Sequence, residues 1–332
     1  MLLSIAVPVH NEKEVLPQLL AEVRKVLHSM DCDYELILVD DGSTDGTTEM
    51  LAEAAESDPR LKVLFFSRNF GHQTAITAAI DHASGDATVI IDADLQDPPS
   101  LLPIMLEWIE QGYDVVSAQR IDRKSDSWFK RTTAIGFYRL MRAGVDSRLT
   151  PNVGDFRMFS RRALIALREL PEKHRFMRGM VAWLGLKEAI VPFERQPRAA
   201  GETKYPLRKM LKFAWTAISS FSALPLRIST YFGIFVTICG LLYAIYSMYA
   251  AFVLKATVQG WTSLIVLQVI FSGTILIAIG MVGEYLARVY EESKRRPLYI
   301  VNHAVNFAPV MRPSNGIVLP TLEQPHKQHV RR

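Results

Sequence analysis

The sequence predicts an α/β fold with a mostly parallel sheet, followed by two helices long enough to cross a membrane. Short apolar runs alternate with helical patterns from residue 2 to about 120. This order is typical of right-handed strand–helix–strand crossovers, which build a parallel sheet with helices on both faces. Two later segments, 229–254 and 256–283, are apolar and uncharged. Each exceeds the roughly 20 residues that span a bilayer, and two buried core helices are the alternative.

Each expected strand is a short apolar run. The strands cover residues 2–9, 35–40, 62–67, 87–92 and 114–119. Apolar residues at helical spacing predict helices between them, at about 12–28, 45–56, 72–83 and 99–111. Residues 152–160 are expected to form a further short strand that begins with Gly154 and Asp155. Residues after about 302 show no clear periodicity and are expected to form a loose tail.

Composition narrows the possible classes. Hydrophobic residues make up 49% of the chain and charged residues 22%, which is apolar for a soluble protein. The net charge of +4 does not by itself indicate nucleic acid. Cys32 and Cys239 are far apart and predict neither a disulfide framework nor a cysteine zinc site. Because a strand begins at residue 2, we expect no secretory signal peptide.

The most informative stretch is residues 92–97, where a buried strand leaves the sheet. In an extended segment alternate residues point the same way, so Asp92, Asp94 and Gln96 could hold one hard cation. Asp97 stands before two prolines and suits the N-cap of a helix. The alternative explanation is an acidic loop followed by a capped helix.

Three more loops bring polar residues to the carboxyl ends of the strands, where open α/β sheets bind ligands. Turn and cap chemistry explains each loop taken singly, whereas four loops at one edge favour a nucleotide site. No Gly-rich phosphate fingerprint follows a strand, so a metal and basic side chains would hold phosphate. The residues singled out in and beside the three loops are Pro8, Asn11, Glu12, Asp41 and Arg68.

Basic segments follow the expected sheet. Residues 127–143 combine aromatic residues at helical spacing with Lys130 and Arg131, which suits either a membrane-surface helix or a helix packed on the sheet. Asp155 is flanked by apolar residues and needs either a function or an ion-pair partner such as Arg157. Residues 194–205, which include Lys204, predict a mobile basic loop able to cover an anion. Residues 207–222 form a second basic amphipathic pattern.

Charges around the two apolar segments predict their orientation. Only Lys255 marks the connection between them, while basic residues cluster before the first and after the second. By the positive-inside rule, the N-terminal domain and both termini are expected in the cytoplasm. The clustered residues are Arg208, Lys209, Lys212, Arg227, Arg288, Lys294, Arg295 and Arg296.

Four motifs taken together resemble the polyprenyl-phosphate glycosyltransferases of glycosyltransferase family 2, and most nearly the bacterial bactoprenol glucosyltransferases. The likeness runs from residue 2 to about 300 and includes the apolar hairpin. His10 departs from it, because the family often has Tyr or Phe there. The Q-x-x-R-W motif of processive polysaccharide synthases is absent. The motifs are Val-Pro-Val-His-Asn-Glu at 7–12, Val-Asp-Asp-Gly-Ser-Thr-Asp at 39–45, Asp-Ala-Asp-Leu-Gln-Asp-Pro at 92–98 and Gly-Asp-Phe-Arg at 154–157.

The resemblance implies a Rossmann-like GT-A domain that transfers a sugar, with inversion, from a UDP-sugar to undecaprenyl phosphate. It implies glucose as the sugar and Mg²⁺ or Mn²⁺ as the cofactor, bound by Asp92, Asp94 and Gln96. Asp155 is by likeness the catalytic carboxylate, with Asp94 beside it. The implied donor-binding residues are Pro8, Asn11, Glu12, Asp41, Arg68 and Asp92. The candidates for the acceptor phosphate are Arg120, Lys130, Arg131 and Lys204.

The expected organisation is a cytoplasmic GT-A domain over 1–204, an interface helix over 205–227, a transmembrane hairpin over 228–286 and a basic tail over 287–332. The two spans of the hairpin are expected at about 229–254 and 260–284. The protein is expected in the bacterial inner membrane, serving O-antigen or cell-envelope glycosylation, with no nucleic-acid partner; the family suggests a tetramer. Three alternatives remain open. They are transfer of aminoarabinose, mannose, galactose or N-acetylhexosamine, a soluble acceptor, and a non-catalytic scaffold or lipid-translocation component.

Overall fold

A computed structural model of the chain describes residues 1–121, 150, 152–173, 175–194, 224–253, 260–307 and 315–319. The chain divides into two compact units, which are described separately. The first consists of Met1–Tyr138, Arg148–Lys204 and Arg296–Arg332, and the second of Arg139–Ser147 and Tyr205–Arg295. The expected interface helices at 127–143 and 207–222 lie outside the described residues, as does the basic loop after Glu194.

Within the described residues, the first unit holds one nine-stranded sheet in the order β7-β5-β6-β4-β1-β2-β3-β8-β9. Strand β1 pairs in parallel with β2 and β4, and β2 with β3. Strand β6 runs antiparallel to β4 and β5, and β8 runs antiparallel to β3. The prediction of a mostly parallel sheet is confirmed. The strands are β1 Leu2–Val9, β2 Asp33–Asp40, β3 Leu61–Phe66, β4 Ala87–Ile90, β5 Val115–Arg120, β6 Val153–Ser160, β7 Glu188–Phe193, β8 Tyr299–Val305 and β9 Gly316–Val318.

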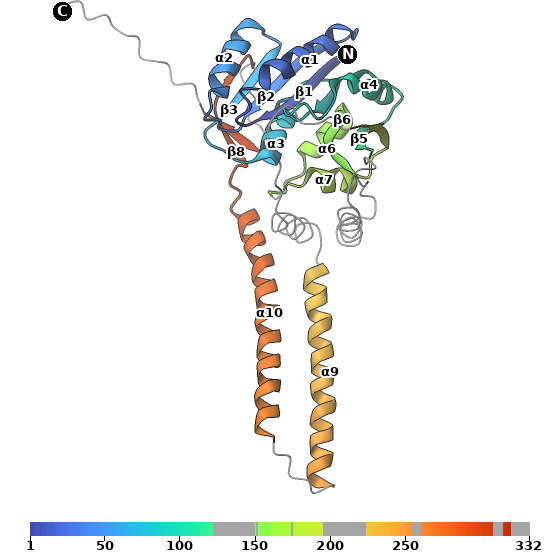
Figure 1. The fold of residues 1–332 in the computed structure, drawn as a ribbon, viewed down its shortest axis with the longest axis vertical. Coiled ribbons are helices and arrows are strands. Elements are labelled where there is room, and N and C mark those ends of the chain that lie inside the picture. The colour runs from blue at the N-terminus through green and yellow to red at the C-terminus, as the bar shows by residue number, and fades with distance from the viewer. Residues whose placement is uncertain are drawn as a thin grey trace, which may run out of the picture. The chain divides into compact units, whose positions relative to one another are not determined.

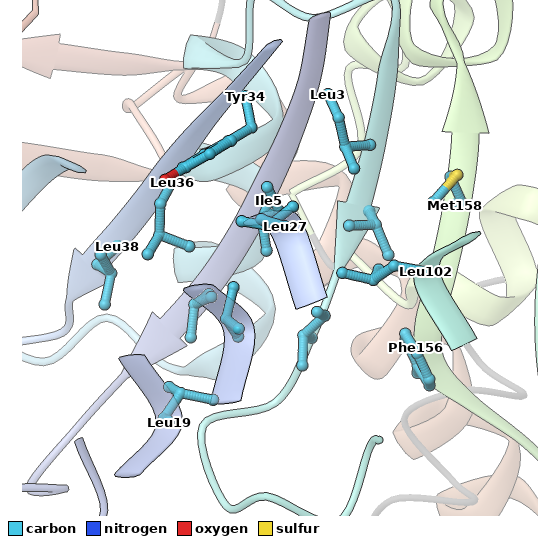
Figure 2. Close-up of a cluster of buried hydrophobic side chains, with 14 of the residues drawn as sticks. Leu3, Ile5, Leu19, Leu27, Tyr34, Leu36, Leu38, Leu102, Phe156 and Met158 are labelled. Carbon is cyan, nitrogen blue, oxygen red and sulfur yellow. The ribbon is translucent and has the colours of Figure 1, made fainter. Parts of the chain in front are cut away.

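Helices cover both faces of this sheet (Figure 1). Leu3, Ile5 and Val7 on one face of β1 share a core cluster with apolar residues of α1, α2 and α4 (Figure 2). Ser4 and Ala6 are also fully buried, on the opposite face, where α3 contacts β1 and β2, and α6 contacts β4 and β6. Burial on both faces explains why the strands appear as continuous apolar runs. The helices are α1 Leu16–His28, α2 Thr47–Ser57, α3 His72–His82, η1 Pro99–Leu101, α4 Leu102–Glu110, α6 Arg161–Arg168 and α7 Met177–Leu184.

Residues 303–307 and 315–319 contradict the expectation of a loose tail after residue 302, and the rest of that tail lies outside the described residues. Strand β8 pairs antiparallel with β3, and β9 pairs in parallel with β8. Tyr299 is fully buried, and its hydroxyl donates to Asp81 Oδ2 at 2.9 Å. Asn306 Nδ2 donates to the carbonyl oxygens of Ala55 and Leu61 at 2.7 and 2.8 Å. Strand pairing and single side chains that bond to distant parts of the chain hold this segment, and such contacts leave no periodic pattern in the sequence.

The second unit contains two long helices, α9 Leu224–Phe252 and α10 Trp261–Ser293. Two candidate membrane spans, Leu226–Ala250 and Leu267–Ser293, have mean hydropathies of 1.9 and 1.8. Their apolar side chains face outward: Phe235 is 62% exposed and Leu276 69%. A Cβ on Gly240 would lie 2.5 Å from Phe271 Cζ, so glycine lets the two helices approach closely. The two predicted apolar helices are confirmed, and their exposure rules out the alternative of buried core helices.

Candidate active site

The candidate active site lies at the carboxyl edge of the parallel strands. Strand β1 has β2 on one side and β4 on the other, which makes this edge a topological switch point. Strand β6 runs the opposite way, so its first residues lie at the same edge. The pairing of β4 with β6 sets Ile90 opposite Arg157. Continued by two residues on each strand, this register brings Asp92 toward Asp155.

The loops after β1, β2 and β3 are joined by hydrogen bonds. The Asn11 backbone N–H donates to Ser43 Oγ at 2.9 Å, and Asn11 Oδ1 accepts from the Thr44 N–H at 2.8 Å. His10 Nε2 lies 3.3 Å from Asn11 Nδ2 and 3.2 Å from Asn69 Nδ2. His10 and Asn11 therefore connect all three loops while remaining exposed.

Asp41 fixes the loop between β3 and α3. Its two carboxylate oxygens accept the N–H groups of Phe70 and Gly71 at 2.6 and 2.9 Å. Gly42 beside it has a φ of +67°, and a Cβ there would lie 2.7 Å from the carbonyl carbon of Arg68. Glycine is required at this turn for both reasons.

The predicted donor-binding residues share this edge. Pro8 lies in β1 and is buried. The Glu12 N–H donates to Thr47 Oγ1 at 3.1 Å, and the Arg68 guanidinium lies 4.0 Å from the centre of the Phe70 ring. The structure thus places Asn11, Glu12, Asp41 and Arg68 in neighbouring loops, with Pro8 near the end of β1.

The acidic loop differs from its prediction in two ways. Strand β4 ends at Ile90, and Leu95 has a left-handed φ of 58°, so residues 92–97 form a turn rather than an extended segment. The expectation that Asp97 caps a helix is also wrong, because Pro98 occupies the N-cap position without a side-chain bond. Asp97 Oδ2 instead accepts the Asp92 N–H at 3.3 Å, and its Oδ1 lies 3.6 Å from Arg120 Nη2.

Like charges crowd this loop. Burial and the charge of Asp92 raise the pKa of Asp97 to about 7. The pKa of Asp92 is raised as well, by burial and by the charges of Asp155 and Asp94, against the opposing effect of His72. One oxygen of Asp92 and one of Asp97 are buried and accept no hydrogen bond from any residue that the structure describes. Crowded carboxylate oxygens of this kind fit a hard divalent cation.

The chain by itself provides few ligands for such a cation. Among the residues that the structure describes, no group of three or more His, Cys, Asp or Glu side chains is placed to hold a metal. Gln96 is buried, and its backbone N–H donates to Asp94 Oδ1 at 3.1 Å. Mg²⁺ commonly takes one or two protein carboxylates and completes its shell with substrate phosphate and water. The donor set of Asp92 and Asp94 fits that arrangement.

Donors from two helices surround Asp155, near the start of β6. Gln73 Nε2 donates to Asp155 Oδ2 at 2.8 Å, and Arg178 Nε lies 3.4 Å from Oδ1. His72 Nε2 lies 3.6 Å from Asp155 Oδ2 and 3.5 Å from Asp92 Oδ1, so it bridges the two carboxylates. Burial alone would raise the pKa of Asp155. The hydrogen bond from His72 and the charges of Arg178 and Arg157 instead hold that pKa well below its usual range.

Arg157 is not the ion-pair partner that the sequence suggested as an alternative. In the described part of the chain, the charged groups within 4 Å of Asp155 come from His72 and Arg178. Arg157 is buried, and burial lowers its pKa to about 10 despite the charges of Glu188 and Asp155.

Three residues of this site were not predicted from the sequence as site residues: His72, Gln73 and Arg178. Asp97 was predicted as a helix cap and instead accepts the Asp92 N–H. The run Gly-His-Gln at 71–73, which opens a helix directly after a strand, could have indicated the first two. Of the predicted acceptor residues, Arg120 lies beside Asp97. Lys130, Arg131 and Lys204 lie outside the described residues.

The chain is similar in sequence to known glycosyltransferases. The profile of glycosyl transferase family 2 matches residues 4–168. An uncharacterized glycosyltransferase of Bacillus subtilis is 46% identical over 90% of this chain and 92% of its own length. The bactoprenol glucosyl transferase of Shigella phage SfV is 40% identical over 91% of this chain and 99% of its own length. A crystal structure of glucosyl-3-phosphoglycerate synthase from Mycobacterium tuberculosis in complex with Mn²⁺, UDP and glucosyl-3-phosphoglycerate is similar over 66% of this chain and 77% of that chain, with 19% identity and a TM-score of 0.44.

Proposed function

Since the chain belongs to glycosyl transferase family 2, we propose that it transfers glucose from UDP-glucose to undecaprenyl phosphate with inversion. The observation that carries this proposal is the similarity to bactoprenol glucosyl transferases over nine-tenths of the chain. The chain is thus a glycosyltransferase related to those enzymes. The sugar and the lipid acceptor are the proposed part.

In the proposed reaction an oxygen of the acceptor phosphate forms a bond to the anomeric carbon of the sugar. The bond from that carbon to the diphosphate breaks on the opposite face, and UDP leaves with the electron pair. The acceptor is already an anion at neutral pH, so no proton has to be removed. Asp155 is held ionised by its donors, and a carboxyl with a strongly lowered pKa is a weak base. Its proposed role is to orient groups around the anomeric carbon.

The proposed donor site uses the joined loops of β1, β2 and β3. Pro8, Asn11, Glu12, Asp41 and Arg68 would hold the nucleotide, since hydrogen bonds already fix the loops that carry them. Asp92, Asp94 and Gln96 would hold Mg²⁺ or Mn²⁺, which stabilises charge on departing UDP when bound. Arg120 beside Asp97, with Lys130, Arg131 and Lys204, remains proposed for the acceptor phosphate.

The two candidate spans fit the proposed acceptor, because a polyprenyl phosphate stays in the bilayer and its enzyme must work at the membrane. We propose an inner-membrane location with the catalytic unit and both termini in the cytoplasm. Support comes from Arg227 at the start of the first span, Arg288 near the end of the second, and Lys294 and Arg295 directly after it. A reporter fused after residue 300 should be active only as a cytoplasmic reporter. Activity as a periplasmic reporter would reject this orientation.

The function is tested with a panel of radiolabelled nucleotide sugars added to membranes that contain the full chain and undecaprenyl phosphate. Label from UDP-glucose should enter the lipid extract and co-migrate with a polyprenyl-phosphate sugar. Label from another donor would replace glucose with that sugar, and a water-soluble product would indicate a soluble acceptor. No product and no UDP release with any donor would favour a non-catalytic scaffold.

A further inference from the structure

We propose that Arg178 contacts a phosphate of the substrates through the terminal nitrogens of its guanidinium. Arg178 lies in the first turn of α7, and its Nε lies 3.4 Å from Asp155 Oδ1. Its side chain is 33% exposed, whereas that of Asp155 is 11% exposed. The inner end of the guanidinium is thus held by a buried carboxylate, while part of the side chain stays accessible.

Other arginines of the same unit bond differently. Arg162 directs both Nε and Nη2 to the carboxylate of Asp114. Arg168 and Arg175 each use Nε and Nη2 on backbone carbonyls. For Arg178, in contrast, only Nε has a partner within the portion of the chain that the structure describes. An arginine that served only to neutralise Asp155 would gain more from the two-pronged geometry that Arg162 adopts.

Gln73 fixes the position of Arg178. Its Oε1 accepts the Met177 backbone N–H at 3.1 Å, and its Nε2 donates to Asp155 Oδ2 at 2.8 Å. A backbone N–H can only donate, so the amide oxygen must face Met177 and the amide nitrogen must face Asp155. One side chain of α3 therefore ties the first turn of α7 to Asp155. This contact holds Arg178 in place before any ligand binds.

The surroundings indicate the chemistry of the missing partner. A chain of contacts runs from Asp92 in the acidic loop through His72 to Asp155 and on to Arg178. Arg178 and His72 thus contact different oxygens of Asp155. A guanidinium whose two terminal nitrogens have no partner among the described residues fits two oxygens of one phosphate. The inference rests on the proposed function, which supplies two such anions: the donor diphosphate and the acceptor phosphate.

The experiment compares full-length Arg178→Gln, Arg178→Lys and the control Arg162→Gln in detergent. Binding of UDP with Mg²⁺ is measured by calorimetry, and the KM for undecaprenyl phosphate is measured at saturating donor. Loss of a charge-assisted phosphate contact should weaken one of these by about tenfold or more in Arg178→Gln. Arg178→Lys should recover part of the loss, and Arg162→Gln should change neither constant by more than about twofold.

The two binding constants together show which phosphate, if any, Arg178 contacts. Weaker UDP binding assigns Arg178 to the donor diphosphate, and a raised acceptor KM with normal UDP binding assigns it to the acceptor. If both constants stay at wild-type values in folded Arg178→Gln, or only kcat falls, the phosphate contact is rejected. Should Arg178→Gln fail to fold, Arg178→Lys decides, because a point charge lacks the two-pronged geometry and should still weaken binding measurably. If the wild type binds UDP but transfers no sugar to lipid, the proposed function fails, while the UDP measurement still tests Arg178.

Discussion

Two loops at the same edge of the sheet each contain neighbouring aspartates, yet their carboxylates have opposite surroundings. In the loop after β2, all four oxygens of Asp40 and Asp41 accept hydrogen bonds. Their donors are the N–H groups of Ser43, Phe70 and Gly71 and the hydroxyl of Thr48. In the loop after β4, Asp92 and Asp97 each keep one buried oxygen without a hydrogen bond from the described part of the chain.

This difference distinguishes a loop whose carboxylates stabilise the fold from a loop whose carboxylates are arranged to bind a cation. A buried carboxylate that accepts backbone N–H groups stabilises the loop that supplies them. Buried carboxylates that repel one another weaken the fold unless a cation joins them. The loop after β4 therefore has the arrangement expected of a binding site. Around the loop after β2, hydrogen bonds to Asp40 and Asp41 hold in place the residues proposed to bind the nucleotide, Asp41 among them. Aspartates placed alike in the sequence thus differ in role because of their donors.

The largest effect is expected from removing the cation. Excess EDTA should abolish sugar transfer, and added Mg²⁺ or Mn²⁺ should restore it, because no lysine-bearing phosphate loop replaces the metal. Asp94→Asn should raise the Mg²⁺ concentration needed for half-maximal activity. Asp40→Asn is the control and should leave that concentration unchanged. Full turnover in excess EDTA would show that the loop after β4 holds no catalytic metal.

A smaller loss of activity is expected at Asp155, whose oxygens face side-chain donors rather than backbone. Asp155→Asn keeps the shape but removes the charge that holds His72 and Arg178. We expect kcat to fall about a hundredfold with little change in donor KM, as for a group that acts mainly in the transition state. Steady-state kinetics on the purified variant test this. A kcat near the wild-type value would leave Asp155 with a structural role alone.

The two loops also show how far sequence reasoning reached. Strands β1 to β6 follow from apolar runs and spacing, which are local properties. The aspartates at 41, 92, 94 and 155 follow from strand ends. The partners of Asp155 do not, because Gln73 and Arg178 reach it only through the antiparallel placement of β6 and the fold of α7. Strand β8 was missed for the same reason, since residues such as Asn306 anchor it to distant backbone.

Stability should respond most strongly to filling the turn beside Asp41. Gly42→Ala places a Cβ at 2.7 Å from backbone atoms of Arg68 and Asn69, in a left-handed conformation. We expect a loss of about 3 kcal/mol in the free energy of unfolding, from strain and overpacking together. Gly112→Ala is the matched control, because Gly112 has a φ of +84° and open space around it. It should cost only about 1 kcal/mol, and equal losses in thermal melts would contradict the close approach at Gly42.

The smallest effects are expected when an asparagine replaces one aspartate in each loop, and they should have opposite signs. In Asp41→Asn an amide nitrogen must face the N–H of Phe70 or of Gly71, so a buried donor loses its acceptor. This should cost about 2 kcal/mol. In Asp97→Asn the amide oxygen can still accept the Asp92 N–H, while the repulsion from Asp92 and Asp94 disappears.

The Asp97→Asn chain should therefore melt higher than the wild type in EDTA, and the gain should shrink in Mg²⁺, because a bound cation already offsets the repulsion in the wild type. The weakened contact with Arg120, at 3.6 Å, works against this gain and keeps it near 1 kcal/mol. Thermal melts of both variants with and without Mg²⁺ give the comparison. If Asp97→Asn lowers the melting temperature in EDTA as Asp41→Asn does, the carboxylates after β4 are structural, like those after β2, and the metal proposal loses its physical basis.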